Sequence, residues 1–281
     1  MSLSDSRFLA ISALLSALII VSGCSSGSNL PQPGTPAFYW QAAKETFAAG
    51  DYTKTTTALD NILTSDNEYT ARALPWSLVL TSGMASGYMQ LADTYMAGAR
   101  VNRSDPSAFR TQAANHRAFA NRLALHFAES FARMDQLKDA DVALAFGYPP
   151  GSAADVVEFT KLGAGRVLTP AEVDSMQKRA IERGVLLAAC SAAGAPNASA
   201  KTEEILKAPN AQVPKATFLL AMAKALYEES QLYTRDKLDD PDKLTLFCQR
   251  AQDALKTVPA SKDTKDLATK IQNVLKKSKK T

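Results

Sequence analysis

Side chains able to do acid–base or metal chemistry are few in this 281-residue chain and lie far apart. It contains two histidines, His116 and His126, in a stretch with helical periodicity. Ten residues of helix separate them by about 15 Å, which is too far for one metal ion to bind both. His116 shares its helix face with Phe119 and Phe127, which predicts a histidine packed among apolar side chains. The histidines therefore predict neither a metal centre nor a catalytic pair.

An acidic run from Asp236 to Asp242 invites comparison with a calcium-binding loop. Counted from Asp236, an EF-hand needs glycine at its sixth position and glutamate at its twelfth. These positions hold Pro241 and Phe247, so we expect a helix cap in a solvated turn. Residues 163–166 read Gly-Ala-Gly-Arg, but a dinucleotide loop needs a third glycine and a preceding strand. We predict a protein that is not an enzyme and that holds no metal or dissociable cofactor.

The N-terminal segment carries the most specific signal. Residues 8–21 form an apolar run that spans about 21 Å as a helix, less than the ~30 Å core of a membrane. Such a run is typical of a signal peptide. It ends in Val21-Ser22-Gly23-Cys24. This stretch resembles the bacterial lipobox, in which an aliphatic residue and two small residues precede a lipidated cysteine. The alternatives are a plain secretory signal or a short anchor in which Cys24 has no role.

The lipobox resemblance implies a domain organisation and a location. Residues 1–23 would be the signal peptide, and Cys24 would become the N-terminus and carry covalent lipid. Several acyl chains anchor a protein stably, whereas one chain alone is marginal. The residue after the cysteine is Ser25. In the lipoprotein pattern, a residue other than aspartate at this position implies the outer membrane, and the protein would then face the periplasm. Residues 24–36 are rich in serine, glycine and proline and should form a flexible tether to a folded domain over 37–281.

The remaining two cysteines, Cys190 and Cys248, would then lie in an oxidising compartment. A disulfide between two helices of the C-terminal half is one interpretation. Two buried free thiols are the other, because both cysteines are in phase with apolar neighbours. The sequence leaves both interpretations open.

From residue 37 onward, apolar positions recur with helical period and no alternation of strands and helices appears, which predicts an all-α fold. Between residues 147 and 168 the pattern is irregular, and a long loop with a short helix is expected there. Such loops in compact domains are often functional. The expected helices cover 37–49, a segment containing Leu59 to Leu63, 75–99, 106–136, 170–193 and 201–207, followed by helices starting near 215 and 241 and a last one containing Leu267 to Leu275.

The first two of these helices resemble a tetratricopeptide repeat. The resemblance implies antiparallel helix pairs stacked as a solenoid, or a compact helical-repeat bundle. Thr46 departs from the pattern, since an aromatic residue is usual there. The matching positions are Tyr39, Ala42 and Ala43 in the first helix, Gly50-Asp51-Tyr52 at the turn, and Thr55, Leu59 and Ile62 in the second helix.

The helix expected over 75–99 has two notable faces. Gly83, Ser86 and Gly87 make part of it thin, and close packing should offset the cost of interior glycines. Methionine and tyrosine suit adaptable binding surfaces, so a second face is a candidate groove for a partner. The alternative is burial of that face against the helix over 106–136. The candidate groove residues are Trp76, Met84, Tyr88, Leu91 and Tyr95.

The formal net charge of +4, with both signs interspersed, is too mild for a nucleic-acid binder. We therefore expect a protein partner in the cell envelope, with a homo-oligomer also open. The chain is similar to the T component of TRAP-type transporters. The similarity rests on the order of segments, on Ala71–Pro75 and on the arginine- and alanine-rich stretch over 117–124. That similarity implies a non-enzymatic protein-binding scaffold that serves as a transporter accessory subunit. The alternative is a carrier or chaperone of a lipid or other apolar ligand.

Overall fold

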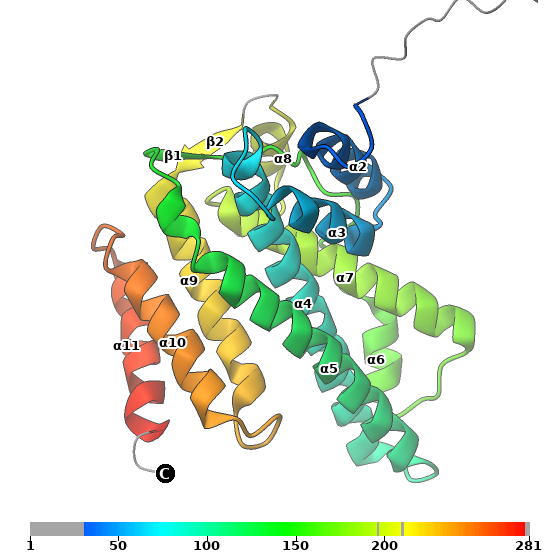
Figure 1. Ribbon diagram of the computed structural model, residues 1–281. Helices are drawn as coiled ribbons and strands as arrows, with labels where there is room; N and C mark the ends of the chain where they lie inside the picture. Colours follow the sequence, from blue (N-terminus) through cyan, green and yellow to red (C-terminus); the bar gives the residue numbers. More distant parts are fainter. Residues whose placement is uncertain (1–30, 196, 209–210, 279–281) are drawn as a thin grey trace, which may run out of the picture.

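The computed structural model describes residues 31–195, 197–208 and 211–278. Almost all secondary structure in this part is helical, which confirms the expected all-α class (Figure 1). The predicted signal peptide and Cys24 lie outside the described residues. In the part of the chain that is described, no helix is both long and apolar enough to cross a membrane.

An antiparallel pair, α2 (Pro36–Ala48) and α3 (Tyr52–Ile62), opens the described chain. Gly50 joins the two helices with φ of 74°, a conformation that residues with a Cβ rarely adopt. The hydroxyls of Thr46 and Thr55 hydrogen-bond at 3.0 Å across the pair. Thr46, which departs from the repeat pattern, thus joins the two helices by a polar contact instead of an aromatic one.

The next helix, α4 (Thr70–Val101), is central to the fold. It begins at Thr70, before the start that Pro75 predicts, and just ahead of it the Asn67 side chain accepts a hydrogen bond from the Tyr69 N–H. In a solenoid each unit contacts only its neighbours in sequence. Here α4 contacts α3, α5, α6, α7 and α9, so the described helices form a bundle around α4.

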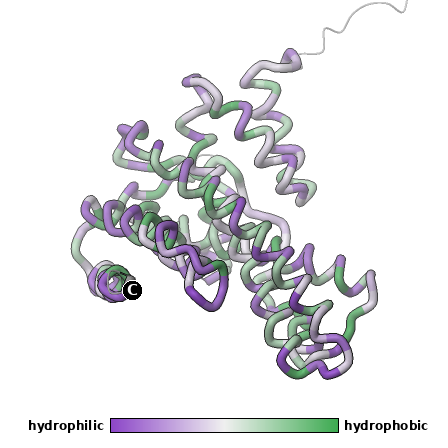
Figure 2. The backbone as a smooth tube through the Cα atoms, turned by 60° about the horizontal axis from the view of Figure 1, so that its bottom comes forward, coloured by the Kyte–Doolittle hydropathy of each residue, from purple (hydrophilic) through white to green (hydrophobic). Residues whose placement is uncertain are grey.

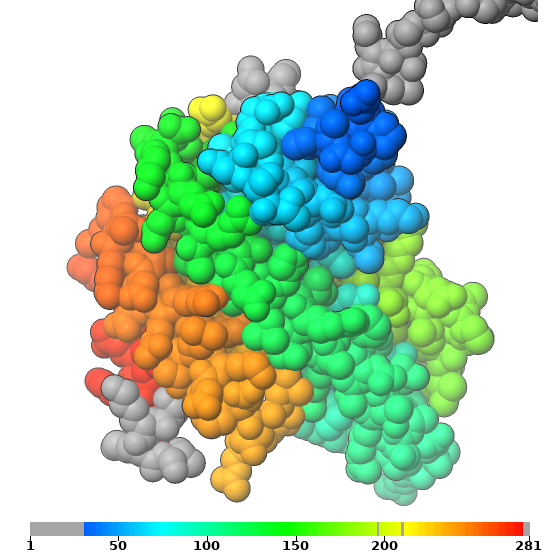
Figure 3. Space-filling view, viewed as in Figure 1, coloured from blue at the N-terminus to red at the C-terminus, as the bar shows by residue number. Residues whose placement is uncertain are grey.

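Helix α5 (Pro106–Phe131) runs antiparallel to α4 and crosses the face seen in Figure 3, between the α2–α3 pair and the C-terminal helices. Asp105 caps its first turn and Pro106 occupies the first helical position. The helix ends five residues before the expected Gln136, and a short 3₁₀ turn (Met134–Gln136) follows.

Helix α7 (Pro170–Ala192) contacts α4 backbone to backbone. A Cβ placed on Gly83 would lie 2.5 Å from the Cα of Val185, and one on Gly87 would overlap the α7 backbone. On α7, Gly184 lies against Gly83 in the same way. This confirms that the thin part of α4 is closely packed.

A loop with the short helix α6 (Val157–Gly163) leads into α7, as expected. Helix α8 (Ala200–Lys207) follows α7. The structure also contains a short two-stranded ribbon that the all-helical expectation missed, with one strand before α6 and the other after α8. In this ribbon β1 (Asp141–Ala143) pairs antiparallel with β2 (Gln212–Pro214). Three residues per strand are too few to show the period of two that identifies a strand in sequence.

The last three helices are α9 (Lys215–Ser230), α10 (Pro241–Leu255) and α11 (Lys262–Ser278). A 3₁₀ turn (Gln231–Tyr233) joins the first two of them. Helix α9 packs on α4, α7 and α10, while α10 and α11 lie at the outer edge (Figure 1). Hydrophilic and hydrophobic stretches alternate along most of the chain (Figure 2), whereas α4 is buried on all sides over residues 73–85.

Candidate functional site

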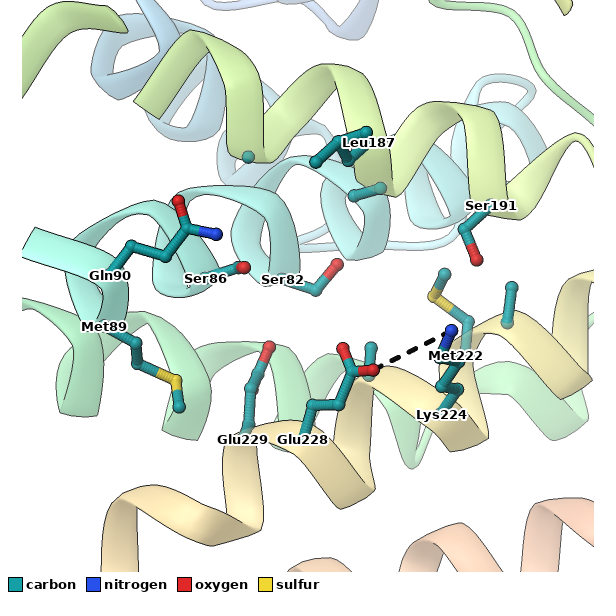
Figure 4. Close-up of a pocket in the computed structure, with 14 residues that line it drawn as sticks. Ser82, Ser86, Met89, Gln90, Leu187, Ser191, Met222, Lys224, Glu228 and Glu229 are labelled. Atoms are coloured by element: carbon teal, nitrogen blue, oxygen red, sulfur yellow. Dashed lines mark ion pairs between the residues drawn. The ribbon is translucent and has the colours of Figure 1, made fainter. Parts of the chain in front are cut away.

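A cleft of about 300 Å³ lies where α4, α7 and α9 meet, and it is called here the α4–α7–α9 cleft (Figure 4). Its volume is in the range of small-molecule sites. Polar and apolar side chains both line it. The residues are Ser82, Ser86, Met89 and Gln90 from α4, Gly184, Leu187, Ala188 and Ser191 from α7, and Ala221, Met222, Lys224, Ala225, Glu228 and Glu229 from α9.

The close approach of α4 and α7 creates this cleft. Gly83 and Gly184 bring the two backbones together, and the small side chains of Ser86 and Ala188 lie beside that contact. The third wall, α9, presents Ala225 to the same space. Small residues on all three helices therefore leave a cavity at a point where larger side chains would fill the core.

Glu229 is the most unusual residue of the cleft. Its side chain is 2% exposed, and neither carboxyl oxygen has a hydrogen-bond partner in the described structure. Burial, and secondarily the nearby carboxyl of Glu228, raise the pKa of Glu229 well above its ordinary value of 4.5. In the absence of a ligand, this environment therefore favours the neutral acid form of Glu229.

Glu228 and Lys224 stand on the solvent side of the cleft. Their Oε1 and Nζ atoms lie 3.9 Å apart, and the two side chains are 59% and 56% exposed. An exposed pair one helical turn apart contributes little to stability. Both groups are thus available to a ligand. In Figure 4 the carboxyl groups of Glu228 and Glu229 point from α9 toward the space in front of α4.

The rim of the cleft is joined to the long loop before α7. Gln90 accepts a hydrogen bond from Arg183 Nη1 at 3.3 Å. The same guanidinium donates to the Ala153 carbonyl oxygen at 3.1 Å and to Asp155 Oδ1 at 3.1 Å. The loop that the sequence singles out as functional therefore contacts the cleft through one arginine.

All five candidate groove residues are buried in this structure. Trp76 is fully buried and packs edge-to-face on Trp40 and Phe47, which holds α2 on α4. Leu91 is also fully buried. Tyr95 is 5% exposed and stacks on His116. This face of α4 is buried largely because α5 covers it.

Met84 and Tyr88 are the two groove candidates that reach a cavity. With Phe119, Arg122 and residues of α3 they line a second space of about 290 Å³ between α3, α4 and α5. Tyr88 stacks on Phe119 there. The Arg122 guanidinium lies over the Phe119 ring, 4.7 Å from its centre. These side chains satisfy one another, and no buried polar group among them faces the space without a partner.

Both histidines have structural partners. His116 is buried between Tyr88 and Tyr95, and burial lowers its pKa to about 4, so it packs as a neutral ring, as the sequence predicts. His126 Nε2 lies 3.0 Å from Asp60 Oδ1, and this hydrogen bond raises the histidine pKa. Neither ring lines the α4–α7–α9 cleft.

Cys190 and Cys248 are buried free thiols in the structure. This agrees with the second interpretation of the sequence, and no disulfide joins the two residues. Burial raises the pKa of Cys190 to about 11, which makes its thiol a poor nucleophile. Cys24, the predicted lipidation site, lies outside the described residues. No cluster of three or more metal-ligating side chains is found in the described ranges.

Sequence reasoning missed Glu229, although a signal for it was present. Met222, Ala225 and Glu229 follow one another at spacings of three and four residues, so all three lie on one face of α9. That face is otherwise apolar. A carboxylate on the inward face of an amphipathic helix is the pattern that marks a buried functional acid.

No known protein family, curated protein or solved structure matches this chain.

Proposed function

We propose that this protein is a non-enzymatic envelope protein that binds a small molecule in the α4–α7–α9 cleft. The observation that carries the proposal is a cleft at which three helices present polar side chains next to an unpartnered buried carboxyl group. Cavities that combine apolar walls with a few polar groups are the usual form of a ligand site. A wholly apolar ligand is disfavoured, because it would leave Glu229 without a partner.

Within this proposal, the location and partners are those that the sequence predicts. Cys24 would anchor the chain to the outer membrane on its periplasmic side, and the tether would hold the helical domain clear of the lipid. The α2–α3 pair would be a single tetratricopeptide-like unit, a kind of surface that suits protein partners. The ligand would then pass to or from a transporter subunit that docks on the protein.

Filling the cleft tests ligand binding directly. Ala225 is half-buried on the cleft wall, so Ala225→Phe should occupy much of the 300 Å³. Full-length protein from native membranes should release a small molecule in organic extracts analysed by mass spectrometry. We expect the variant to retain at least tenfold less of it than the wild type.

Ala118→Phe is the matched control, because Ala118 is exposed on α5 and away from the cleft. It should retain the ligand at the wild-type level. Equal retention by Ala225→Phe and the wild type, or an empty wild-type protein, would contradict a ligand site in this cleft.

Crosslinking on native membranes tests the proposed partner and location. After affinity purification, we expect a periplasmic solute-binding protein to be enriched with the wild-type chain. Replacing Cys24 by serine should release the chain from the membrane fraction. A partner confined to another compartment, or a membrane association that survives Cys24→Ser, would contradict the envelope assignment.

A further inference from the structure

We infer, on the basis of the proposed function, that the ligand of the α4–α7–α9 cleft is a small organic cation whose ammonium group binds the Glu229 carboxylate. Glu228, at the mouth of the cleft, would add a second negative charge on the same side of the ligand. The two carboxyl groups project from adjacent positions of α9 toward the cleft (Figure 4).

The first step of the argument concerns hydrogen bonds. An ionised carboxylate is an acceptor only, and it needs donors for two oxygens. Neither oxygen of Glu229 has a donor in the described structure. Leaving a buried polar group unpaired costs about 1–3 kcal/mol, and more when it is charged. An ammonium group supplies up to three N–H donors together with the compensating charge.

The second step concerns the sign of the charge. The charged group that acts on Glu229 is Glu228, which is another carboxyl. The nearest lysine of the lining, Lys224, stands at the mouth beside Glu228 and is more than half exposed. An anionic ligand would meet the carboxyl group of Glu228 at the mouth of the cleft and that of Glu229 on its buried side. A cation is therefore the ligand that this electrostatic arrangement favours.

The third step concerns shape. The cleft has apolar walls from Met89, Leu187 and Met222 around its polar end. The unbranched side chains of Met89 and Met222 adapt easily to a ligand. A volume of about 300 Å³ accommodates an amine with a short apolar chain.

Binding of an ammonium group would be coupled to loss of a proton. The empty site holds Glu229 as a carboxylic acid, so the exchange is Glu229–COOH plus R–NH₃⁺ giving the Glu229–COO⁻ and R–NH₃⁺ ion pair plus one free proton. Affinity should therefore rise with pH by up to tenfold per unit until Glu229 ionises in the empty protein.

In the described part of the chain, few titratable groups surround the Glu229 carboxyl. The titratable residues that face the region are Glu228 and Lys224 on α9, Tyr233 after it, and Lys270 on α11, which acts on Glu228. The cleft residues from α4 and α7 do not titrate. Glu229 is thus the buried group in the cleft that can exchange a proton for a cation.

Isothermal titration calorimetry with butylamine and putrescine tests the inference on the full-length protein. We expect at least one of these amines to bind saturably at pH 8, and at least tenfold more weakly at pH 6. Butan-1-ol, which has the shape of butylamine without the charge, should not bind measurably. Titrations in two buffers of different ionisation enthalpy should show release of about one proton per amine.

Glu229→Gln keeps the size of the side chain and removes its charge. We expect it to weaken amine binding at least tenfold and to abolish the proton release. Glu68→Gln, an exposed glutamate outside the cleft, should behave as the wild type. Ala225→Phe provides a second block that leaves Glu229 in place.

Two outcomes overturn the inference. One is the absence of saturable binding of any of these amines at pH 8, and the other is binding that Glu229→Gln leaves unchanged. If the native extract nevertheless contains a neutral or anionic molecule that Ala225→Phe no longer retains, the cleft is a ligand site and only the cationic class is wrong. If Ala225→Phe retains the native ligand, the proposed function itself fails.

Discussion

Replacing Gly184 with alanine should lower the free energy of unfolding by about 3 kcal/mol, at the upper end of what overpacking usually costs. The added Cβ would overlap the Gly83 carbonyl oxygen and would lie 3.0 Å from the Gly87 nitrogen. These are backbone atoms of α4, so no side-chain rotation relieves the clash. The two helices would have to separate along their contact. Equilibrium unfolding in urea, followed by far-ultraviolet circular dichroism, measures the loss.

Gly163→Ala is the matched control. Gly163 is the last residue of α6, and a Cβ added there would meet nothing within 4 Å. Alanine in a helical position should raise the stability by about 0.5 kcal/mol. A Gly184→Ala protein as stable as the wild type would show that α4 and α7 do not depend on their close contact. Because that contact positions the cleft, the Gly184 variant should also retain less ligand.

The sequence predicts the local elements well, because their signals are local. Thr169 and Glu172 form the capping box that starts α7, and Asp240 caps α10 as expected. Gly83 and Gly87 also predict a close contact, since interior glycines need a packing reason. Which helix makes that contact depends on residues 100 positions away, such as Gly184. A single sequence gives no information on such a pairing.

The candidate groove residues also show that the sequence does not reveal which helix packs against a given face. Tyr88 and Tyr95 form a stripe whether they face a ligand or another helix, because helical spacing is identical in both cases. Only the path of α5 determines that they are buried, with Tyr95 stacked on His116. Glu229 is the opposite case. Its position on an apolar face is visible in the sequence, but its lack of a partner requires knowledge of three helices at once.

Glu229→Gln should make the folded protein more stable at neutral pH, even though it removes the residue on which the proposed site depends. The folded state raises the pKa of Glu229 well above 4.5, the value expected in the unfolded chain. Above pH 4.5 the unfolded chain has released a proton that the folded protein keeps. The free energy of unfolding of the wild type therefore falls as pH rises, by about 1.4 kcal/mol per unit from this one group, until Glu229 ionises in the folded state.

Glutamine does not titrate, so this slope should be missing from Glu229→Gln. The two proteins should have similar stability at pH 4, and the variant should gain about 1.4 kcal/mol over the wild type for each further pH unit in that window. Guanidinium unfolding at pH 4, 5, 6, 7 and 8 measures both slopes, and Glu68→Gln should follow the wild type. Identical pH dependence in Glu229→Gln and the wild type would mean that Glu229 is already ionised and partnered in the folded protein. A gain in stability together with a loss of amine binding would indicate that this carboxyl is kept for its ligand, at a cost to the fold.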